Sequence, residues 1–165
     1  MTIRRKLQLI NTLVAAFALI IISTTLMKGF EEKQKIEQLE TLNELSVRLS
    51  LLIHETQKER GASAGFIGSQ GVKFTTILPQ QRALTDEKKK YYFDFLDTID
   101  IDTLPNDLAL AVGVLSKDID KLAAVRKQVS ALQISLKDEV AYYTSMNAKI
   151  LHIIALTAKL SNDPE

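Results

Sequence analysis

The sequence contains no cysteine, which excludes disulfides and thiolate metal sites. It has only two histidines, far apart in the chain, which leaves little for a histidine-based metal site. With 21 basic and 20 acidic residues, neither sign of charge dominates, so composition gives no argument for nucleic-acid binding. No glycine-rich phosphate loop, nucleophile elbow or pair of catalytic carboxylates appears. We therefore expect no enzyme activity, no cofactor and no metal.

Residues that break helices are also scarce, with six glycines and three prolines in 165 residues. This scarcity, together with many Leu, Ala, Lys and Glu residues, predicts long helices. No alternating strand pattern longer than four residues occurs. Beyond the N-terminal segment, four helices are expected, at about 31–66, 76–98, 106–129 and 136–160. Four amphipathic helices with short connections favour an all-α, up-down bundle.

The N-terminal segment has the pattern of a membrane anchor. A basic cluster, Arg4 to Lys6, precedes Leu7–Met27, a run of 21 residues without charge. A bilayer-spanning helix needs roughly 20 residues, and the basic end is expected to stay in the cytoplasm. A cleaved signal peptide is the competing interpretation, but the sequence after the apolar core fits a cleavage site poorly. We therefore predict a single-pass inner-membrane anchor at residues 1–28 and an extracytoplasmic, periplasmic domain at residues 29–165.

The first long helix carries a seam of core-facing positions at spacings of three and four residues. Gly29 is the only breaker between the anchor and Arg60, so the membrane helix is expected to continue into this helix as one rod. The seam positions are Leu39, Leu42, Ser46, Leu49, Ile53, Thr56 and Arg60. An ideal straight helix drifts by roughly 20° per heptad, which would move the last position toward the edge of the seam.

Arg60 is the candidate site residue because it ends this apolar seam. A guanidinium inside a bundle needs a partner, since removing it from water costs several kcal/mol. A carboxylate on a neighbouring helix, backbone carbonyls or a bound anion could each serve. The planar fork of donors suits a planar oxyanion such as nitrate or a carboxylate. The pattern alone leaves these alternatives open.

Arg82 is a weaker candidate for the same chemistry. It lies four residues before Asp86, so an exposed ion pair within one helix is the default interpretation. A second anion ligand is the alternative.

Three spaced motifs resemble the nitrate- and nitrite-sensing domain of bacterial receptors. The first is QKERGASAGFIGSQG at residues 57–71, followed by Phe74. The second is Gln81-Arg82 with Thr85-Asp86, and the third is Ala141-Tyr142-Tyr143-Thr144 with Asn147 and Leu151. The resemblance runs from about Leu45 to the C-terminus.

This resemblance implies an all-helical extracytoplasmic sensor of the kind found in chemoreceptors, histidine kinases, cyclases and transcription antiterminators. Members of the family are taken to bind nitrate or nitrite between helices through arginines. One of these arginines lies in an E-R-G motif, where Arg60 lies here. The implied function is a ligand-sensing module of a membrane signal-transduction receptor, such as a chemotaxis receptor, with Arg60 as anion ligand and Arg82 as a second candidate.

The sequence also departs from the family. The family's domain is about twice as long and carries a second E-R motif, whereas this chain stops at Glu165. It is therefore predicted to be the front half of a sensor, without its cytoplasmic output domain. The expected partners are nitrate or nitrite, the inner membrane and a second copy in a homodimer, with no nucleic acid. The alternative function is a membrane-tethered helical-bundle interaction protein with no small-molecule ligand.

Overall fold

The computed structural model describes residues 3–162, including their side chains except those of residues 6–12 and 14–15. The helices are α1 (Ile3–Gly68), α2 (Ile77–Leu96), the short 3₁₀ helix η1 (Ile101–Thr103), α3 (Asn106–Asp120), α4 (Leu122–Ser130) and α5 (Leu136–Asn162). No strand occurs among the described residues, so the all-α class is confirmed.

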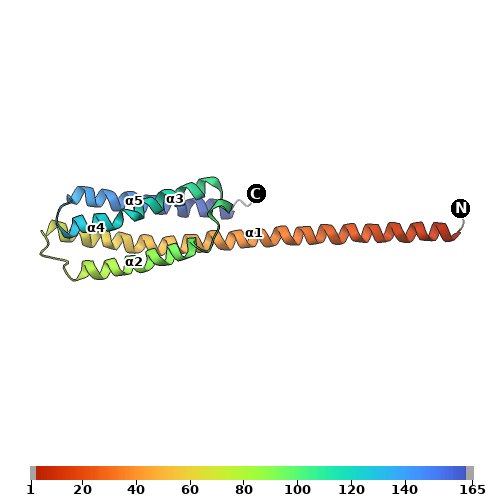
Figure 1. Ribbon diagram of the computed structural model, residues 1–165, viewed down its shortest axis with the longest axis horizontal. Helices are drawn as coiled ribbons and strands as arrows, with labels where there is room; N and C mark the ends of the chain where they lie inside the picture. Colours follow the sequence, from red (N-terminus) through yellow and green to blue (C-terminus); the bar gives the residue numbers. More distant parts are fainter. Residues whose placement is uncertain (1–2, 163–165) are drawn as a thin grey trace. The chain divides into compact units, whose positions relative to one another are not determined.

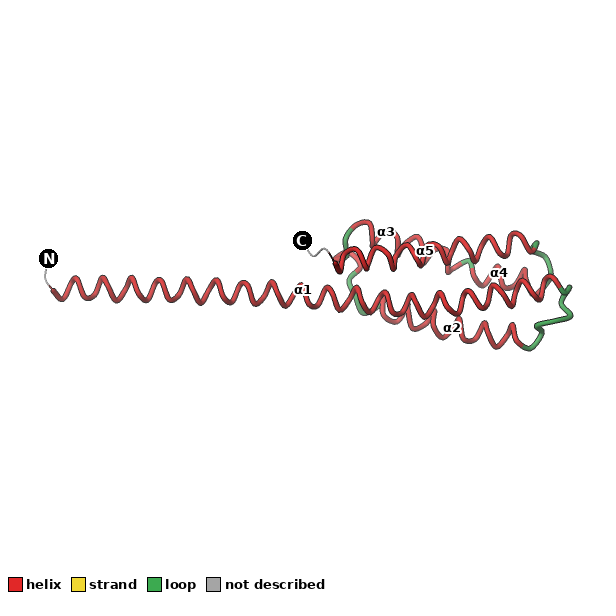
Figure 2. Tube along the Cα trace, turned by 180° about the vertical axis from the view of Figure 1, so that it is seen from behind, coloured by secondary structure: helices red, strands yellow, loops and turns green. Residues whose placement is uncertain are grey.

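The chain divides into two compact units, a first unit at Met1–Glu40 and a second unit at Thr41–Glu165. Within the second unit, successive helical runs alternate in direction: the end of α1, then α2, then α3 with α4, then α5 (Figure 1). Short loops join them at the two ends of this bundle (Figure 2). The up-down arrangement follows from these short connections.

The predicted helix at 106–129 is divided at Lys121, so that α3 and α4 replace one long helix. The backbone tightens there, because the N–H of Lys121 bonds the carbonyl of Asp118 at 3.1 Å, three residues back rather than four. The helical pattern resumes when the N–H of Val125 bonds the carbonyl of Lys121. No glycine or proline lies at this point, so the sequence gives no sign of the division.

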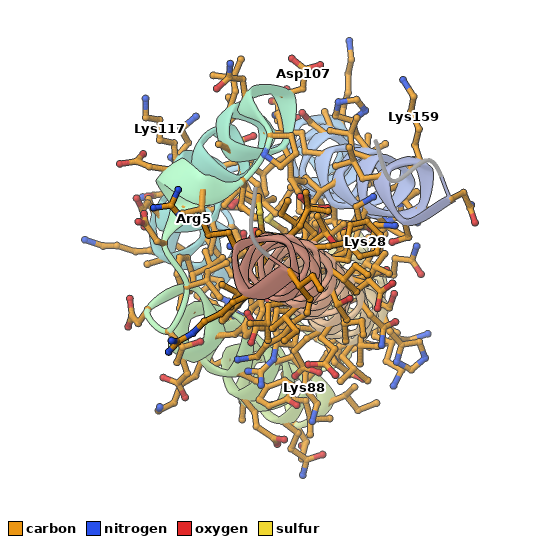
Figure 3. The ribbon with its side chains drawn as sticks, turned by 90° about the vertical axis from the view of Figure 1, so that its right-hand side faces the viewer. Arg5, Lys28, Lys88, Asp107, Lys117 and Lys159 are labelled. Carbon is orange, nitrogen blue, oxygen red and sulfur yellow. The ribbon has the colours of Figure 1, made fainter. Side chains whose placement is uncertain are left out.

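The hydrophobic core of the second unit lies between the end of α1 and α2, α3 and α5. From α1 it takes Leu42, Leu45, Leu49, Leu52 and Ile53, and from the other helices it includes Tyr92, Leu108, Leu115, Tyr143, Met146 and Ile150. Burying one such side chain contributes roughly 1.5–3 kcal/mol. Charged side chains such as Lys117 and Lys159 project away from this bundle (Figure 3).

The turn after α1 depends on a close approach of Gly65 to Phe74. A Cβ atom added at Gly65 would lie 2.2 Å from Cε2 of Phe74, so a larger residue would collide with the ring. Gln70, Gly71 and Phe74 all have positive φ, which lets the chain reverse tightly. The small residue at position 65 thus allows the close packing of this turn.

The predicted transmembrane helix is not supported and is corrected. No helix within the described residues is long and apolar enough to cross a membrane. The predicted span, 7–27, includes side chains 7–12 and 14–15, which lie outside the described residues.

Candidate functional site

The buried face of α1 changes from apolar to polar after Ile53. Its next buried side chains include Thr56, Glu59 and Ser63, of which Glu59 and Ser63 have no exposed surface. Around them lies a set of side chains that we call the polar layer. Its members are Glu59 and Arg60 from α1, Arg82 and Asp86 from α2, Arg126 from α4, and Glu139, Tyr143 and Thr144 from α5.

Glu59 and Arg126 form the centre of the polar layer. Nε and Nη2 of Arg126 each lie 2.7 Å from an oxygen of Glu59, which makes the pair bidentate. Nη1 of Arg126 donates to Asp86 at 2.8 Å, and the hydroxyl of Tyr143 donates to Glu59 at 2.7 Å. Burial lowers the pKa of Arg126, but the bonds and charge of Glu59 and Asp86 outweigh it and raise that pKa. The cluster therefore joins α1, α2, α4 and α5 through charged hydrogen bonds.

The sequence reasoning missed Arg126, although a signal for it exists. Arg126 lies four residues after Leu122 and three before Val129, and both of these are buried. Residues at these spacings share a helix face, so an arginine there must meet the core.

Arg60 lies at the edge of the core rather than inside it. Its residue is half-buried, whereas the neighbouring Glu59 occupies the fully buried position. The expectation that Arg60 is buried is therefore wrong. A straight helix drifts off a strict heptad, and this drift moves Arg60 toward the edge of the buried face. Nη1 of Arg60 donates to the hydroxyl of Thr144 at 3.1 Å. Among the described residues, no carboxylate comes within salt-bridge distance of it.

The default interpretation of Arg82 as the partner of Asp86 is wrong. Asp86 bonds Arg126 at 2.8 Å and Lys89 at 3.0 Å instead. Arg82 donates through Nη1 to Ser130 at 2.9 Å and through Nη2 to the carbonyl of Arg126 at 3.2 Å. Its Nε is buried without a hydrogen-bond partner in the described structure, 3.9 Å from Glu59. Burial lowers the pKa of Arg82, and the charge of Glu59 opposes that effect.

Glu139 is the most unusual carboxyl in the polar layer. It lies in the first turn of α5, has no exposed surface, and neither of its oxygens has a hydrogen-bond partner within the described residues. Burial raises its pKa to about 7, against the opposing charge of Arg60 and with a smaller contribution from Glu59. The sequence signal for it was its place four residues before Tyr143, on the buried face of α5.

The three motifs meet around this layer. Tyr143 and Thr144 of the third motif bond Glu59 and Arg60 of the first. One turn away, Thr56 donates to Asn147 at 2.6 Å.

The second motif joins through its glutamine. Nε2 of Gln81 donates to Glu55 at 2.7 Å. Residues widely separated in sequence thus form one connected polar region in the bundle.

Comparisons with known proteins agree on one family. The family described as nitrate and nitrite sensing matches residues 51–165. The nitrate regulatory protein of Klebsiella oxytoca is 25% identical over 134 residues, which cover 81% of this chain and 34% of that protein. The solved structure of the NasR transcription antiterminator has a TM-score of 0.74 at 26% identity, covering 80% of this chain and 36% of that one. The chain thus spans about a third of the length of these relatives.

These similarities overturn several expectations. The relatives are named as a regulatory protein and a transcription antiterminator, and neither name describes a membrane receptor. No helix in the described part of the chain could span a membrane. The predicted membrane receptor, with its chemotaxis role and inner-membrane, periplasmic location, is therefore wrong, as is the membrane-tethered alternative. The antiterminator also contradicts the expectation that nucleic acid has no part in the function.

Proposed function

Because the chain belongs to the nitrate and nitrite sensing family, we propose that it is an anion-sensing domain that responds to nitrate or nitrite. Arg60 is the proposed ligand of the anion. The observation that carries this assignment is the state of its guanidinium, which lies half-buried and bonds a neutral hydroxyl. Within the described residues, Arg60 has no carboxylate partner. Of the charged groups in the polar layer, its guanidinium is therefore the one most available to bind an anion.

The chemistry of Arg60 and Thr144 fits a small planar oxyanion. The nitrogens of Arg60 other than the one bound to Thr144 offer parallel donors to two oxygens of the same ion. The hydroxyl of Thr144 accepts a bond from Arg60 and can donate its own proton to a further oxygen. Partial burial strengthens the attraction, since the effective dielectric is lower there than in water.

Arg82 is proposed as a secondary contributor. Two of its nitrogens are already engaged, by Ser130 and by the carbonyl of Arg126. It therefore contributes positive charge to the polar layer more readily than a direct bond to the anion.

Signalling is proposed to follow from the helices that the anion would join. Arg60 lies on α1 and Thr144 on α5, so an ion bound to both favours one packing of these two helices. Glu59, the neighbour of Arg60, extends the connection through Arg126 to α4 and through Asp86 to α2. An anion can shift such a bundle only if it binds one arrangement more tightly than the other.

The output of the sensor is proposed from its relatives. One is named a nitrate regulatory protein and another a transcription antiterminator, so we propose that the domain controls a regulator of gene expression. The chain matches about a third of each relative. Contact with nucleic acid would be made by regions of such a regulator outside that matched third. A second copy of this chain is a further proposed partner. The predicted division into residues 1–28 and 29–165 also remains a proposal, while every member of the polar layer lies in the second unit.

Titration calorimetry of the full chain with sodium nitrate and sodium nitrite tests the function. We expect binding to the unmodified chain and a loss of about 10- to 100-fold in affinity for Arg60→Ala, because charge-assisted bonds contribute about 1.5–3 kcal/mol. Arg5→Ala, an exposed arginine in the first unit, is the matched control and should bind like the unmodified chain. Equal binding by Arg60→Ala would show that the site is misassigned. No binding of either anion to the unmodified chain would refute the function itself.

A further inference from the structure

Glu139 has the properties of a buried proton acceptor whose charge interacts with that of Arg60, the proposed anion ligand. It lies on α5, the helix whose Thr144 bonds Arg60. Its side chain is fully buried, and its two oxygens lack hydrogen-bond donors in the described structure. Packing does not require a carboxyl there, since an apolar side chain would fill the same space without a desolvation cost. The first turn of α5 favours a negative charge through the helix dipole, while burial favours the neutral acid.

The charged groups that act on Glu139 come from α1. These are Arg60, which favours the ionised carboxylate, and Glu59, which opposes it. Glu59 is itself compensated by Arg126 of α4, with Tyr143 of α5 bonded to it and Arg82 of α2 at 3.9 Å. Arg60 is thus the group in this environment whose charge still needs a counter-charge.

The charges of the polar layer do not balance without Glu139. Among the members of the layer, Arg60, Arg82 and Arg126 supply three positive charges, while Glu59 and Asp86 supply two negative charges. Lys89 also pairs with Asp86, but it lies outside the layer and water screens its charge, because its side chain is 34% exposed. One positive charge therefore remains. Either the ionised carboxylate of Glu139 or an external monovalent anion can compensate it, and both together would leave an excess negative charge in a buried region, which is costly.

We propose that Glu139 takes up a proton when nitrate or nitrite binds at Arg60, so that the site responds to anion and proton together. In this step the carboxylate of Glu139 accepts one proton from solvent, and the anion replaces it as the counter-charge of Arg60. The inference rests on the proposed function of Arg60. By linkage, protonation of Glu139 strengthens anion binding by the same factor by which the anion favours protonation.

The pKa of Glu139 places this exchange near neutral pH. Burial raises that pKa to about 7, and the charge of Arg60 pulls it down. An anion that neutralises Arg60 removes the downward effect, so the pKa rises further in the complex. Binding then takes up little proton well below pH 7, where Glu139 is already neutral. Uptake is largest between pH 7 and the higher pKa of Glu139 in the complex, where it approaches one proton per anion.

The test is calorimetry of the full chain with sodium nitrate between pH 6 and pH 9, in HEPES and in Tris, whose ionisation enthalpies differ. For the unmodified chain we expect proton uptake, and an affinity that weakens by up to about tenfold per pH unit above pH 7. Glu139→Gln mimics the neutral acid, so its affinity should not change across this range. Glu87→Gln, at a glutamate whose side chain is 63% exposed, should behave like the unmodified chain.

A second measurement keeps the test independent of how well Glu139→Gln folds. Carbon-13 NMR of the side-chain carboxyl of Glu139 in the unmodified chain, titrated with and without sodium nitrate, should show its midpoint rising when the anion is bound. Binding that depends on Arg60 but shows no proton uptake and no shift of this midpoint would overturn the inference and leave the proposed function intact. Absence of nitrate and nitrite binding at every pH would overturn both.

Discussion

Two stretches of α1 differ in chemistry although they lie on the same buried face. From Leu42 to Ile53 every buried side chain is leucine or isoleucine. From Glu55 to Ser63 the buried side chains are mainly glutamate, threonine and serine, with Ala62 as the exception. The spacing of three and four residues continues through both stretches. The comparison shows that helical periodicity specifies which face is buried but not what that face does.

The energetics of the two stretches differ as well. A buried leucine stabilises the fold whatever surrounds it, by removing apolar surface from water. A buried ion pair such as Glu59 with Arg126 contributes little net stability, because its attraction is offset by desolvation. Since leucine would pack this face at lower cost, the polar stretch is better explained by ligand sensing than by stability.

Two buried glutamates of the polar region, Glu55 and Glu139, also differ from each other, in the pKa of their carboxyl groups. Burial raises the pKa of Glu55, but hydrogen bonds from Gln81, Lys58 and His54 outweigh it and lower that pKa to about 2. Burial raises the pKa of Glu139 to about 7, because no donor compensates for it. One glutamate is a fixed charge, and the other can change its charge near neutral pH.

The largest effect is expected from breaking the centre of the polar layer. Arg126→Ala leaves Glu59 buried without its bidentate partner, so we expect a loss of about 3–5 kcal/mol in the free energy of unfolding. Urea denaturation followed by circular dichroism measures it. Lys90→Ala, which removes an exposed pair with Asp94, should cost roughly 0.2–1 kcal/mol. If the two variants lost similar free energies of unfolding, the pair of Glu59 with Arg126 would contribute no more than an exposed ion pair.

Leu49→Ala is the corresponding change in the apolar stretch. The side chain has no exposed surface, so truncation should cost about 3 kcal/mol in the free energy of unfolding. Nitrate affinity of the folded protein should stay within about twofold of the unmodified chain, because Leu49 lies outside the polar layer. Urea denaturation and calorimetry at a temperature where the variant is folded measure the two quantities. A large loss of affinity would show that the stretches are not functionally separate.

Stability against pH distinguishes the two glutamates, with effects of up to about 3 kcal/mol. Glu139 has a raised folded pKa, so its contribution is fully present below about pH 4.5 and is lost as pH rises through about 7. Glu55 has a lowered folded pKa, so its contribution is present above about pH 4.5 and is lost as pH falls through about 2.

Urea denaturation at pH 5 and pH 8.5 tests the assignment for Glu139. Relative to Glu139→Gln, the unmodified chain should be less stable at pH 8.5 than at pH 5. Identical pH profiles for the two proteins would show that Glu139 does not titrate in this range.

Much of the fold could be predicted because its signals are local. Few breakers and regular apolar spacing predicted the helices, and a local cap made by Ser135 and Asp138 begins α5. The N–H of Asp138 donates to the hydroxyl of Ser135 at 3.1 Å, and that hydroxyl donates to the carboxylate of Asp138 at 2.6 Å. The division at Lys121 could not be predicted, because it reflects backbone tightening at a place without glycine or proline.

The site was only partly predictable because it depends on contacts distant in sequence. The first motif indicated Arg60. Which of Glu59 and Arg60 is buried depends on how the helix is rotated about its axis, and the sequence alone does not give that rotation. The pairing of Asp86 with Arg126 joins residues 40 apart, and local spacing favoured Arg82 instead. Tertiary contacts decide which of several nearby charges are paired.

The smallest expected effect comes from Thr144→Val, which removes the hydroxyl bonded to Arg60 and keeps the shape of the side chain. Because Thr144 is exposed, the folded state should lose little stability. One bond to a charged group and one possible donor to the anion are lost, so nitrate affinity should fall by about 3- to 10-fold, near 1 kcal/mol. Ser145→Ala, next to it and also exposed, is the control in the same calorimetric titration. An unchanged affinity for Thr144→Val would place the anion on the other side of the Arg60 guanidinium, away from α5.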